Sequence, residues 1–340
     1  MPTGLNARAA GIVAAGLADA DRLGLVGHRT DAGVQIVDAG VKAAGGDEAG
    51  LLLAHAALAG LGEVWLEACG TPPHHRRIHP ASDPWDGRCP WPIVAVESEE
   101  PIAACLASQY AGWKVSEGKY FAMASGPLRA AIGREDLYED IGLRERADVA
   151  VGLLESSKLP PDDVCLRLAT EAGVSADHLL LLVARTASRA GTLQVVARSL
   201  ETALHKLHKL HKLHDLHFDL GRIRAGLGRA PLPPVPSPPD DLEAIGRTND
   251  AILYGGQVVL EVTGPDAGLD DVAAAMVSGA SASHGRPFRA LFKEAGYDFY
   301  KLDPALFAPA VVELVNIDTG VRHRAGSIMA DVVRMSFGGA

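Results

Sequence analysis

Arg198 and Glu201 are the residues whose types and spacing best fit catalysis in this 340-residue sequence. They are three positions apart on a helix expected to begin near Thr192, so their side chains project from one face. A carboxylate beside an arginine in a cleft can act as general base for water, and the arginine holds its orientation. Spacing alone favours the plainer alternative, a surface ion pair that contributes about 0.3 kcal/mol.

A hydroxyl-rich turn precedes this helix. Residues 186–192 read Thr-Ala-Ser-Arg-Ala-Gly-Thr and follow an apolar run at 179–184 that predicts a buried strand. In α/β proteins, ligands commonly bind where such strands end. Thr186 and Ser188 are therefore candidate substrate-binding residues.

A second candidate binding segment is 118–127, Gly-Lys-Tyr-Phe-Ala-Met-Ala-Ser-Gly-Pro. Ser125 and Gly126, followed by a proline, predict a turn that opens a helix, and the free amides and dipole there suit an anionic or polar group. Lys119 would add a mobile cation. The alternative is a purely structural turn, which the residues alone favour.

Common catalytic signatures are missing. The segment from Gly112 to Lys119 resembles a phosphate-binding loop, but five residues separate Gly112 from Gly118 where the motif has four. Tyr120 then stands where the motif needs a magnesium-binding hydroxyl, so nucleotide hydrolysis is rejected. The sequence has no G-x-S-x-G, H-E-x-x-H or G-x-G-x-x-G motif either.

Histidines recur every third residue in the tract 205–217, at His205, His208, His211, His214 and His217. On a helix each falls about 60° behind the previous one, so the five wind around the axis and cannot line one face. We favour a duplicated His-Lys-Leu unit on a solvated helix end, with adventitious metal binding as the alternative. A second cluster, 74–79, lies in a Pro-rich context that predicts an exposed loop.

Apolar runs and helical periodicity alternate along the chain and predict a mixed α/β (α+β) fold. Strands are expected at 34–38, 64–69, 93–97, 149–154 and 179–184, and helices at 48–60, 101–112, 162–173 and from 192 onward. Hairpins are expected at 252–263, turning at Gly255-Gly256, and at 311–325, around Asp318-Thr319-Gly320.

The Pro-rich segment 230–241 predicts an extended connector. We take it to separate a first lobe, 1–229, with the catalytic helix near 192–217, from a second lobe, 242–340, with the reservation that the lobes can interleave. At 48% hydrophobic residues, a chain of this length can bury a core of that size.

Composition excludes several classes of protein. The 32 basic and 42 acidic residues give a net charge of -10, which argues against an extended nucleic-acid surface. None of the four cysteines forms a C-x-x-C pair, so we expect buried thiols in a reducing cytosol. Residues 1–25 predict an amphipathic helix and not a signal peptide, and no apolar run reaches about 18 residues, so a cytoplasmic protein without a membrane span is expected.

Long segments of the chain resemble methenyltetrahydromethanopterin cyclohydrolases. The resemblance covers nearly the whole length and is carried by 38–50, 105–113, 118–127, 194–206, 246–256 and 297–309, which include Gly118-Lys-Tyr-Phe-Ala-Met-Ala-Ser-Gly-Pro127 and Gly246-Arg-Thr-Asn-Asp-Ala-Ile-Leu-Tyr-Gly-Gly256. It implies two closely associated lobes with a pterin pocket between them, and a homotrimer. It also implies reversible hydrolysis of a 5,10-methenyl carrier to the 5-formyl carrier in one-carbon metabolism, without a metal, nucleotide or other cofactor.

The same resemblance implies residue roles. The family's catalytic carboxylate falls on Glu201, its companion arginine on Arg198 and a pocket lysine on Lys119. It is closer to the bacterial branch, whose carrier lacks a phosphate-bearing tail. The His-Lys-Leu repeats and the stretch 71–92 are longer than in relatives. The alternatives are a non-catalytic pterin- or metal-binding protein that uses the tract 205–217, and a cyclohydrolase for folate.

Overall fold

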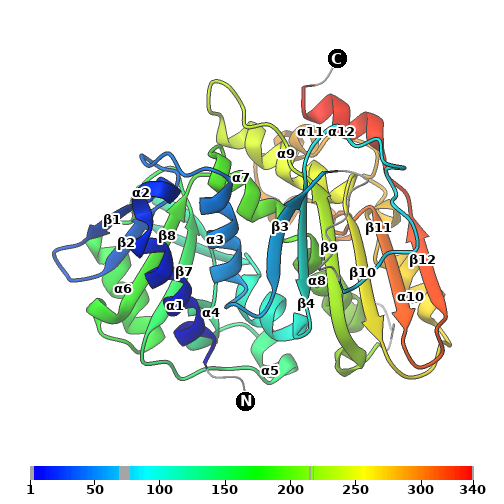
Figure 1. Ribbon diagram of the computed structural model, residues 1–340, viewed down its shortest axis with the longest axis horizontal. Helices are drawn as coiled ribbons and strands as arrows, with labels where there is room; N and C mark the ends of the chain where they lie inside the picture. Colours follow the sequence, from blue (N-terminus) through cyan, green and yellow to red (C-terminus); the bar gives the residue numbers. More distant parts are fainter. Residues whose placement is uncertain (1–3, 69–76, 214–215, 217, 339–340) are drawn as a thin grey trace. The chain divides into compact units, whose positions relative to one another are not determined.

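The computed structural model describes residues 4–68, 77–213, 216 and 218–338. The chain folds into two compact units, and each is built on one six-stranded mixed sheet (Figure 1). The first unit is Met1–Glu63 with Ile102–Val195, and the second is Val64–Pro101 with Val196–Ala340. The mixed α/β class predicted from the sequence is confirmed.

The first sheet has the strand order β1-β2-β8-β7-β6-β5. Its central strands β2, β8 and β7 are parallel, and antiparallel strands flank them on both sides. Parallel strands buried on both faces require nearly continuous apolar runs, as in the Leu-Leu-Leu-Leu-Val-Ala of β8. The bounds are β1 (Val26–Arg29), β2 (Gln35–Asp38), β5 (Trp113–Glu117), β6 (Tyr120–Ser125), β7 (Ala150–Glu155) and β8 (Leu179–Ala184).

Helices cover both faces of this sheet. Val37, Leu153 and Leu182 pack toward α1 and α3, and their neighbours Leu154 and Leu181 pack toward α4 and α6 on the other face, as the two-residue alternation of strands requires. The helices of this unit are α1 (Leu5–Ala18), α2 (Ala20–Leu23), α3 (Asp47–Ala57), the π-helix η1 (Ile102–Gln109), α4 (Leu128–Ile132), α5 (Leu137–Ile141), α6 (Asp162–Ala172), the 3₁₀ turn η2 (Ala176–His178) and α7 (Arg189–Val196), which ends at the unit boundary.

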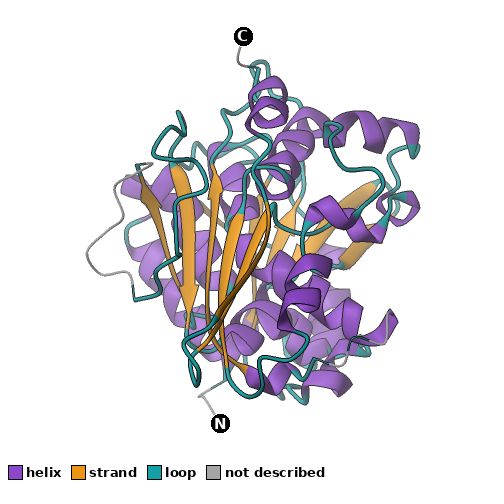
Figure 2. Cartoon of the chain, turned by 90° about the vertical axis from the view of Figure 1, so that its right-hand side faces the viewer, coloured by secondary structure: helices purple, strands orange, loops and turns teal. Residues whose placement is uncertain are grey.

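The second sheet has the order β12-β11-β10-β9-β4-β3, and its strands lie side by side in Figures 1 and 2. β10 and β11 are parallel, whereas β9 is antiparallel to both of its neighbours β10 and β4. The bounds are β3 (Glu63–Glu67), β4 (Ile93–Ser98), β9 (Ile223–Pro231), β10 (Gln257–Val262), β11 (Val311–Asn316) and β12 (Arg322–Gly326).

One face of the second sheet is packed by α8 (Ser199–Leu213), which contacts β4, β9 and β10. Ile78, in the segment that begins at residue 77, packs in one apolar cluster with Leu227 and Val259. That segment is docked, since Trp85 Nε1 donates to the carbonyl of Gly255 at 3.1 Å. The remaining helices are η3 (Leu220–Arg222), α9 (Asp241–Leu253), α10 (Leu269–Ala275), η4 (Ser278–Ala280), α11 (Phe288–Glu294), η5 (Phe299–Lys301), η6 (Pro304–Leu306) and α12 (Ala330–Ser336).

The five predicted strands form, with ends that differ by at most two residues. The hairpin of β11 and β12 and the helix α6 form as well, α3 ends three residues earlier than predicted, and the helix predicted at 101–112 is the shorter π-helix η1. The hairpin predicted at 252–263 is wrong. Ile252 and Leu253 end α9, and Gly255-Gly256 lead into β10. A Cβ on Gly256 would lie 2.6 Å from the carbonyl oxygen of Ile252, so this close helix-to-strand turn requires glycine.

The Pro-rich segment 230–241 joins β9 to α9. The strands on its two sides, β9 and β10, are neighbours in one sheet, and the divisions between the compact units fall after residues 63, 101 and 195 instead. The chain therefore passes from one unit to the other three times, so the two units are not joined by a single linker.

Predicted burial of the cysteines is confirmed for Cys89, Cys105 and Cys165, and Cys69 lies outside the described residues. Half of the predicted loop, 74–76, lies outside them too, and in the other half Arg77 and His79 are exposed whereas Ile78 is buried. Within the described parts of the chain, no helix combines the length and the apolar character needed to cross a bilayer.

Candidate active site

Arg198 and Glu201 lie at the start of α8 and not inside one continuous helix. α7 ends at Val196 and α8 begins at Ser199, so the predicted helix from 192 onward is wrong at this point. The carbonyl of Arg198 accepts from Thr202 N at 2.8 Å and from Thr202 Oγ1 at 2.9 Å. Arg198 therefore takes the N-cap position, and Glu201 lies in the first turn, where the helix dipole favours a carboxylate.

The backbone of β9 fixes where α8 begins. A Cβ on Gly228 would lie 2.5 Å from Leu200 N and 2.5 Å from Ser199 Oγ, and a Cβ on Gly226 would lie 2.6 Å from a methyl carbon of Leu200. Only glycine permits this approach of strand to helix. The first turn of α8, with Glu201, is thereby seated directly on the strand backbone.

Both side chains of the proposed catalytic pair are buried, with Arg198 7% and Glu201 5% exposed. The alternative of a surface ion pair is therefore wrong. Buried charges contribute little net stability, because desolvation offsets their attraction. A gain in folding stability therefore does not explain why an arginine and a glutamate are buried here. The catalytic role of the pair would explain it, and that role stays a prediction.

Thr186 and Ser188 lie in the turn between β8 and α7, at the carboxyl end of the strand as predicted. Ser188 Oγ donates to the carbonyl of Arg185 at 2.8 Å and accepts from Gly191 N at 3.0 Å, the bonding of a helix N-cap. Thr192 Oγ1 donates to the carbonyl of Thr186 at 2.8 Å. The hydroxyl of Ser188 thus organises the turn, whatever else it contacts.

The loop after β2 packs against this turn. The Asp38 carboxylate is fully buried and accepts four backbone amides, those of residues 40–43, at 2.7–3.2 Å. A Cβ on Gly40 would lie 2.2 Å from Ser188 Oγ, so the two loops are in close contact. An amide nest of this kind often binds an external anion, but here Asp38 occupies it.

Lys119 and the pair Ser125-Gly126 lie at opposite ends of β6. Lys119 is exposed at the β5–β6 turn, and the register pairs Met123 with Glu155, the last residue of β7. Lys119 therefore lies beyond the carboxyl end of β7. Because β7 and β8 are parallel, this is the same end of the strands as the one that Thr186 and Ser188 follow. Ser125 is about 20 Å away along the strand, at roughly 3.3 Å per residue. Three of the five predicted binding residues thus lie beyond the carboxyl ends of the parallel strands, and Ser125 and Gly126 lie toward the opposite end.

The predicted turn at Ser125-Gly126 forms, and a helix follows it. Gly126 has φ +90, which requires glycine, and its amide donates to the carbonyl of Ser108 at 2.9 Å. The helix, α4, has five residues, too few for a strong dipole. The amide and dipole argument for anion binding is therefore weaker here than the sequence suggested. Ser125 is fully buried and Gly126 is buried as well, so their role in binding stays a prediction.

The histidine tract continues α8 as far as Leu213. His205 is half-buried, His208 is buried and His211 is exposed, which confirms that successive histidines wind around the helix. A solvated helix end is wrong for this part, because His208 and Leu210 are both buried. His214 and His217 lie outside the described residues.

A buried lysine was missed by the sequence reasoning. Lys206 is 6% exposed, and its Nζ donates to the carbonyl of Ala305 at 3.3 Å. Burial lowers the pKa of Lys206, and Asp303 partly opposes that shift. Its position on the same stripe as Ala203 and Leu210, three and four residues away, was the available signal.

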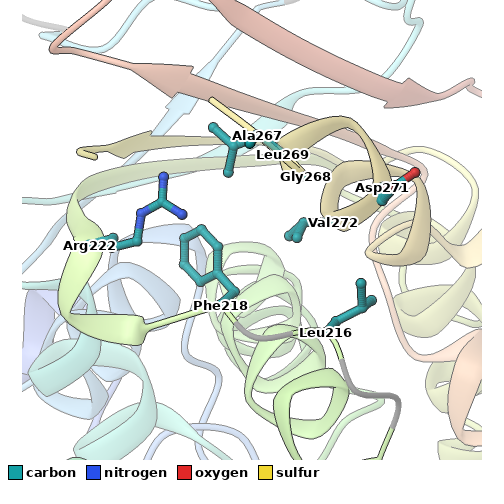
Figure 3. Close-up of a pocket in the computed structure, with 8 residues that line it drawn as sticks. All are labelled: Leu216, Phe218, Arg222, Ala267, Gly268, Leu269, Asp271 and Val272. Carbon is teal, nitrogen blue, oxygen red and sulfur yellow. The ribbon is translucent and has the colours of Figure 1, made fainter. Parts of the chain in front are cut away.

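Two other hollows among the described residues contain none of the predicted site residues. The larger, of about 430 Å³, is lined by Glu243, Arg247, Arg289 and Lys293 among others. Among the described residues, no three His, Cys, Asp or Glu side chains are grouped to hold a metal. The hollow in Figure 3 has about 110 Å³ and is lined by Phe218 and Arg222, with none of the predicted site residues. Arg222 there donates to the carbonyls of Thr263 and Pro265, both at 2.6 Å, so its guanidinium serves the fold.

Comparison with known proteins identifies the family to which the sequence belongs. The family described as cyclohydrolase (MCH) matches residues 4–337. A methenyltetrahydromethanopterin cyclohydrolase of Methylobacillus flagellatus is 43% identical over 94% of this chain and 91% of its own length. This chain belongs to that family.

Relatives from other organisms match this chain with similar identity and coverage. The cyclohydrolase of Rhodopirellula baltica is 44% identical over 93% of this chain and 90% of its own length. That of Methanospirillum hungatei is 39% identical over 92% of this chain and 91% of its own length. The family resemblance found in the sequence is thereby confirmed over almost the whole chain.

Proposed function

We propose that this cyclohydrolase-family chain catalyses the reversible hydrolysis of 5,10-methenyl-tetrahydromethanopterin to the 5-formyl carrier. The full-length family match, 4–337, is the observation that carries the proposal. The buried glutamate in the first turn of α8 supplies a residue type suited to the chemistry. The relatives in methylotrophic and methanogenic organisms suit a role in one-carbon metabolism.

The proposed mechanism uses the substrate's own charge. The methenyl carbon is an amidinium-like electrophile, so a water that bonds to it must lose a proton. Glu201 accepts that proton as general base, and Arg198 orients the carboxylate. One of the two C–N bonds of the adduct's bridging carbon then breaks, and Glu201 returns a proton to the departing nitrogen. The hydroxyl of the adduct becomes the formyl oxygen with release of one proton.

Substrate binding is proposed for Lys119, Thr186 and Ser188 at one edge of the first sheet, and for Ser125 and Gly126 at the end of β6. Because the electrophile already carries positive charge, we infer that no metal, nucleotide or other cofactor takes part. The remaining features follow from the family resemblance: a carrier in its dephospho form, a homotrimer and a cytoplasmic location.

The test is the disappearance of the methenyl chromophore with purified protein. We expect Glu201→Gln to lower kcat by about 10³-fold, the range of a positioned general base. Glu67→Gln is the matched control, because Glu67 has the same 5% exposure but pairs with Arg229 in the second sheet at 2.6 Å. It should lose stability and keep its turnover number.

Two results would count against the proposal in different ways. An unimpaired Glu201→Gln enzyme would remove the catalytic role of Glu201 and leave the activity. Absence of turnover on every methenyl pterin would remove the activity itself. Running methenyl-tetrahydrofolate and the phosphorylated carrier in the same assay distinguishes a folate enzyme and identifies the preferred tail.

A further inference from the structure

The end of the π-helix η1 holds an unusual concentration of polar contacts. The last carbonyls of a helix have no partner within it and must be satisfied from outside. Here three consecutive carbonyls each receive a different donor. Leu106 accepts from Arg129 at 3.5 Å, Ala107 from the hydroxyl of Tyr138 at 2.9 Å, and Ser108 from the amide of Gly126 at 2.9 Å.

Arg129 is the centre of this cap. Its side chain is fully buried, and its guanidinium makes two bonds to Glu135, at 3.0 and 2.5 Å. The same group lies over the rings of Tyr110 and Tyr138, with 4.6 and 5.6 Å to the centroids. A guanidinium that bonds a carboxylate twice and lies over two rings makes contacts that a lysine cannot reproduce.

The cap is joined directly to the turn that carries two predicted binding residues. The backbone amide of Arg129 donates to the carbonyl of Gly126 at 3.1 Å, while the amide of Gly126 donates to Ser108. Gly126 is thus held between the end of η1 and the start of α4. A shift of Arg129 would move both attachments at once.

We infer that Arg129 is a positioning residue for the substrate, which fixes the Ser125-Gly126 turn through its cap on η1. The inference rests on the proposed binding role of that turn. The Arg129 side chain is fully buried and is bonded to Glu135 and to the carbonyl of Leu106, so it contributes no group to the reaction. Its replacement should therefore weaken substrate binding and leave the chemical step unchanged. Binding lost equally from ground and transition states raises KM and leaves kcat unchanged.

The experiment compares Arg129→Lys, Tyr138→Phe, Ser125→Ala and the wild type by KM, kcat and hydrogen exchange of the segment 120–128. We expect a KM about tenfold higher in Arg129→Lys with kcat within about twofold, since losing about one hydrogen bond to the substrate weakens binding by about that factor. Tyr138→Phe removes only the donor to Ala107, so a smaller increase of about threefold in KM is expected. Amide exchange around Gly126 should be faster in both.

Arg229→Lys is the control for a merely structural effect. Arg229 is also a buried arginine, 7% exposed at its side chain, and pairs with Glu67 at 2.6 Å. This control should lower stability without changing KM or the exchange of 120–128. An unchanged KM in Arg129→Lys, with a raised KM in Ser125→Ala, would overturn the inference and leave the binding role of the turn. An unchanged KM in both variants would remove that role, and the inference with it.

Discussion

Ser188 has two candidate roles, substrate binding and capping of a helix. The Thr-Ala-Ser turn predicts substrate binding, yet Ser188 Oγ bonds to Arg185 and Gly191 as the cap of α7. Its single proton is already donated, and one lone pair is taken. What the hydroxyl can still offer a substrate is one acceptor site, so its main energetic role is in the turn.

The first prediction follows from this bonding. Ser188→Ala removes a helix cap, so we expect the free energy of unfolding to fall by about 1 kcal/mol. The KM should change by no more than about fivefold, because a neutral hydrogen bond typically contributes about 1 kcal/mol to binding. Urea unfolding and initial-rate kinetics on the same preparation check both. Thr202→Ala, a hydroxyl within the first turn of α8, serves as the comparison, and a tenfold rise in KM for Ser188→Ala alone would contradict the prediction.

At the scale of elements, α9 is tied to α11 through one buried carboxylate. Asp250 Oδ1 accepts from Phe288 N, at the start of α11, at 2.8 Å. Burial raises the pKa of Asp250 to about 7, and the bonds from Ser336 and Phe288 N only partly oppose this. Asp250 therefore ionises near neutral pH in the folded protein.

This junction should weaken as the pH rises. The folded protein binds the proton of Asp250 more tightly than the unfolded chain, where the pKa is 3.8, so stability is full below about pH 4 and falls as the pH rises through about 7. Between pH 5 and pH 8 the wild type should lose on the order of 2 kcal/mol more than Asp250→Asn, which keeps the acceptor for Phe288 N. Urea unfolding of both proteins at the two pH values measures the difference. Equal losses would show that Asp250 titrates normally.

The elements also show where sequence reasoning succeeds and where it stops. β2, β7 and β8 were predictable because buried parallel strands are continuous apolar runs. The start of α8 was not, because Gly226 and Gly228, about 30 residues later, determine how closely the chain approaches β9. The false hairpin at 252–263 has the same cause: the apolar residues before Gly255 belong to the buried face of α9, and periodicity cannot separate a short helix end from a strand.

At the scale of the whole molecule, the family resemblance and the residue patterns contribute different things. Patterns alone lead to a mixed α/β protein with an arginine and a glutamate of uncertain meaning, and the family match supplies the reaction. Burial then adds an independent observation, because Arg198 and Glu201 are both buried, unlike an ordinary surface pair. Which residues contact the substrate depends on positions far apart in sequence, which spacing does not encode.

The last prediction concerns metals and the histidine tract. Water attack on a carbon that already bears positive charge gains little from a Lewis acid, so dialysis against a chelator should leave turnover unchanged. His208 is buried and His211 is exposed on α8, so the two face different surroundings and cannot jointly hold an ion. His211→Ala should therefore keep the wild-type kcat and KM, whereas His208→Ala should lose stability by about 1–2 kcal/mol through the cavity it leaves. Activity that falls on chelation and returns with zinc, in the wild type but not in His211→Ala, would contradict this and assign the tract a working role.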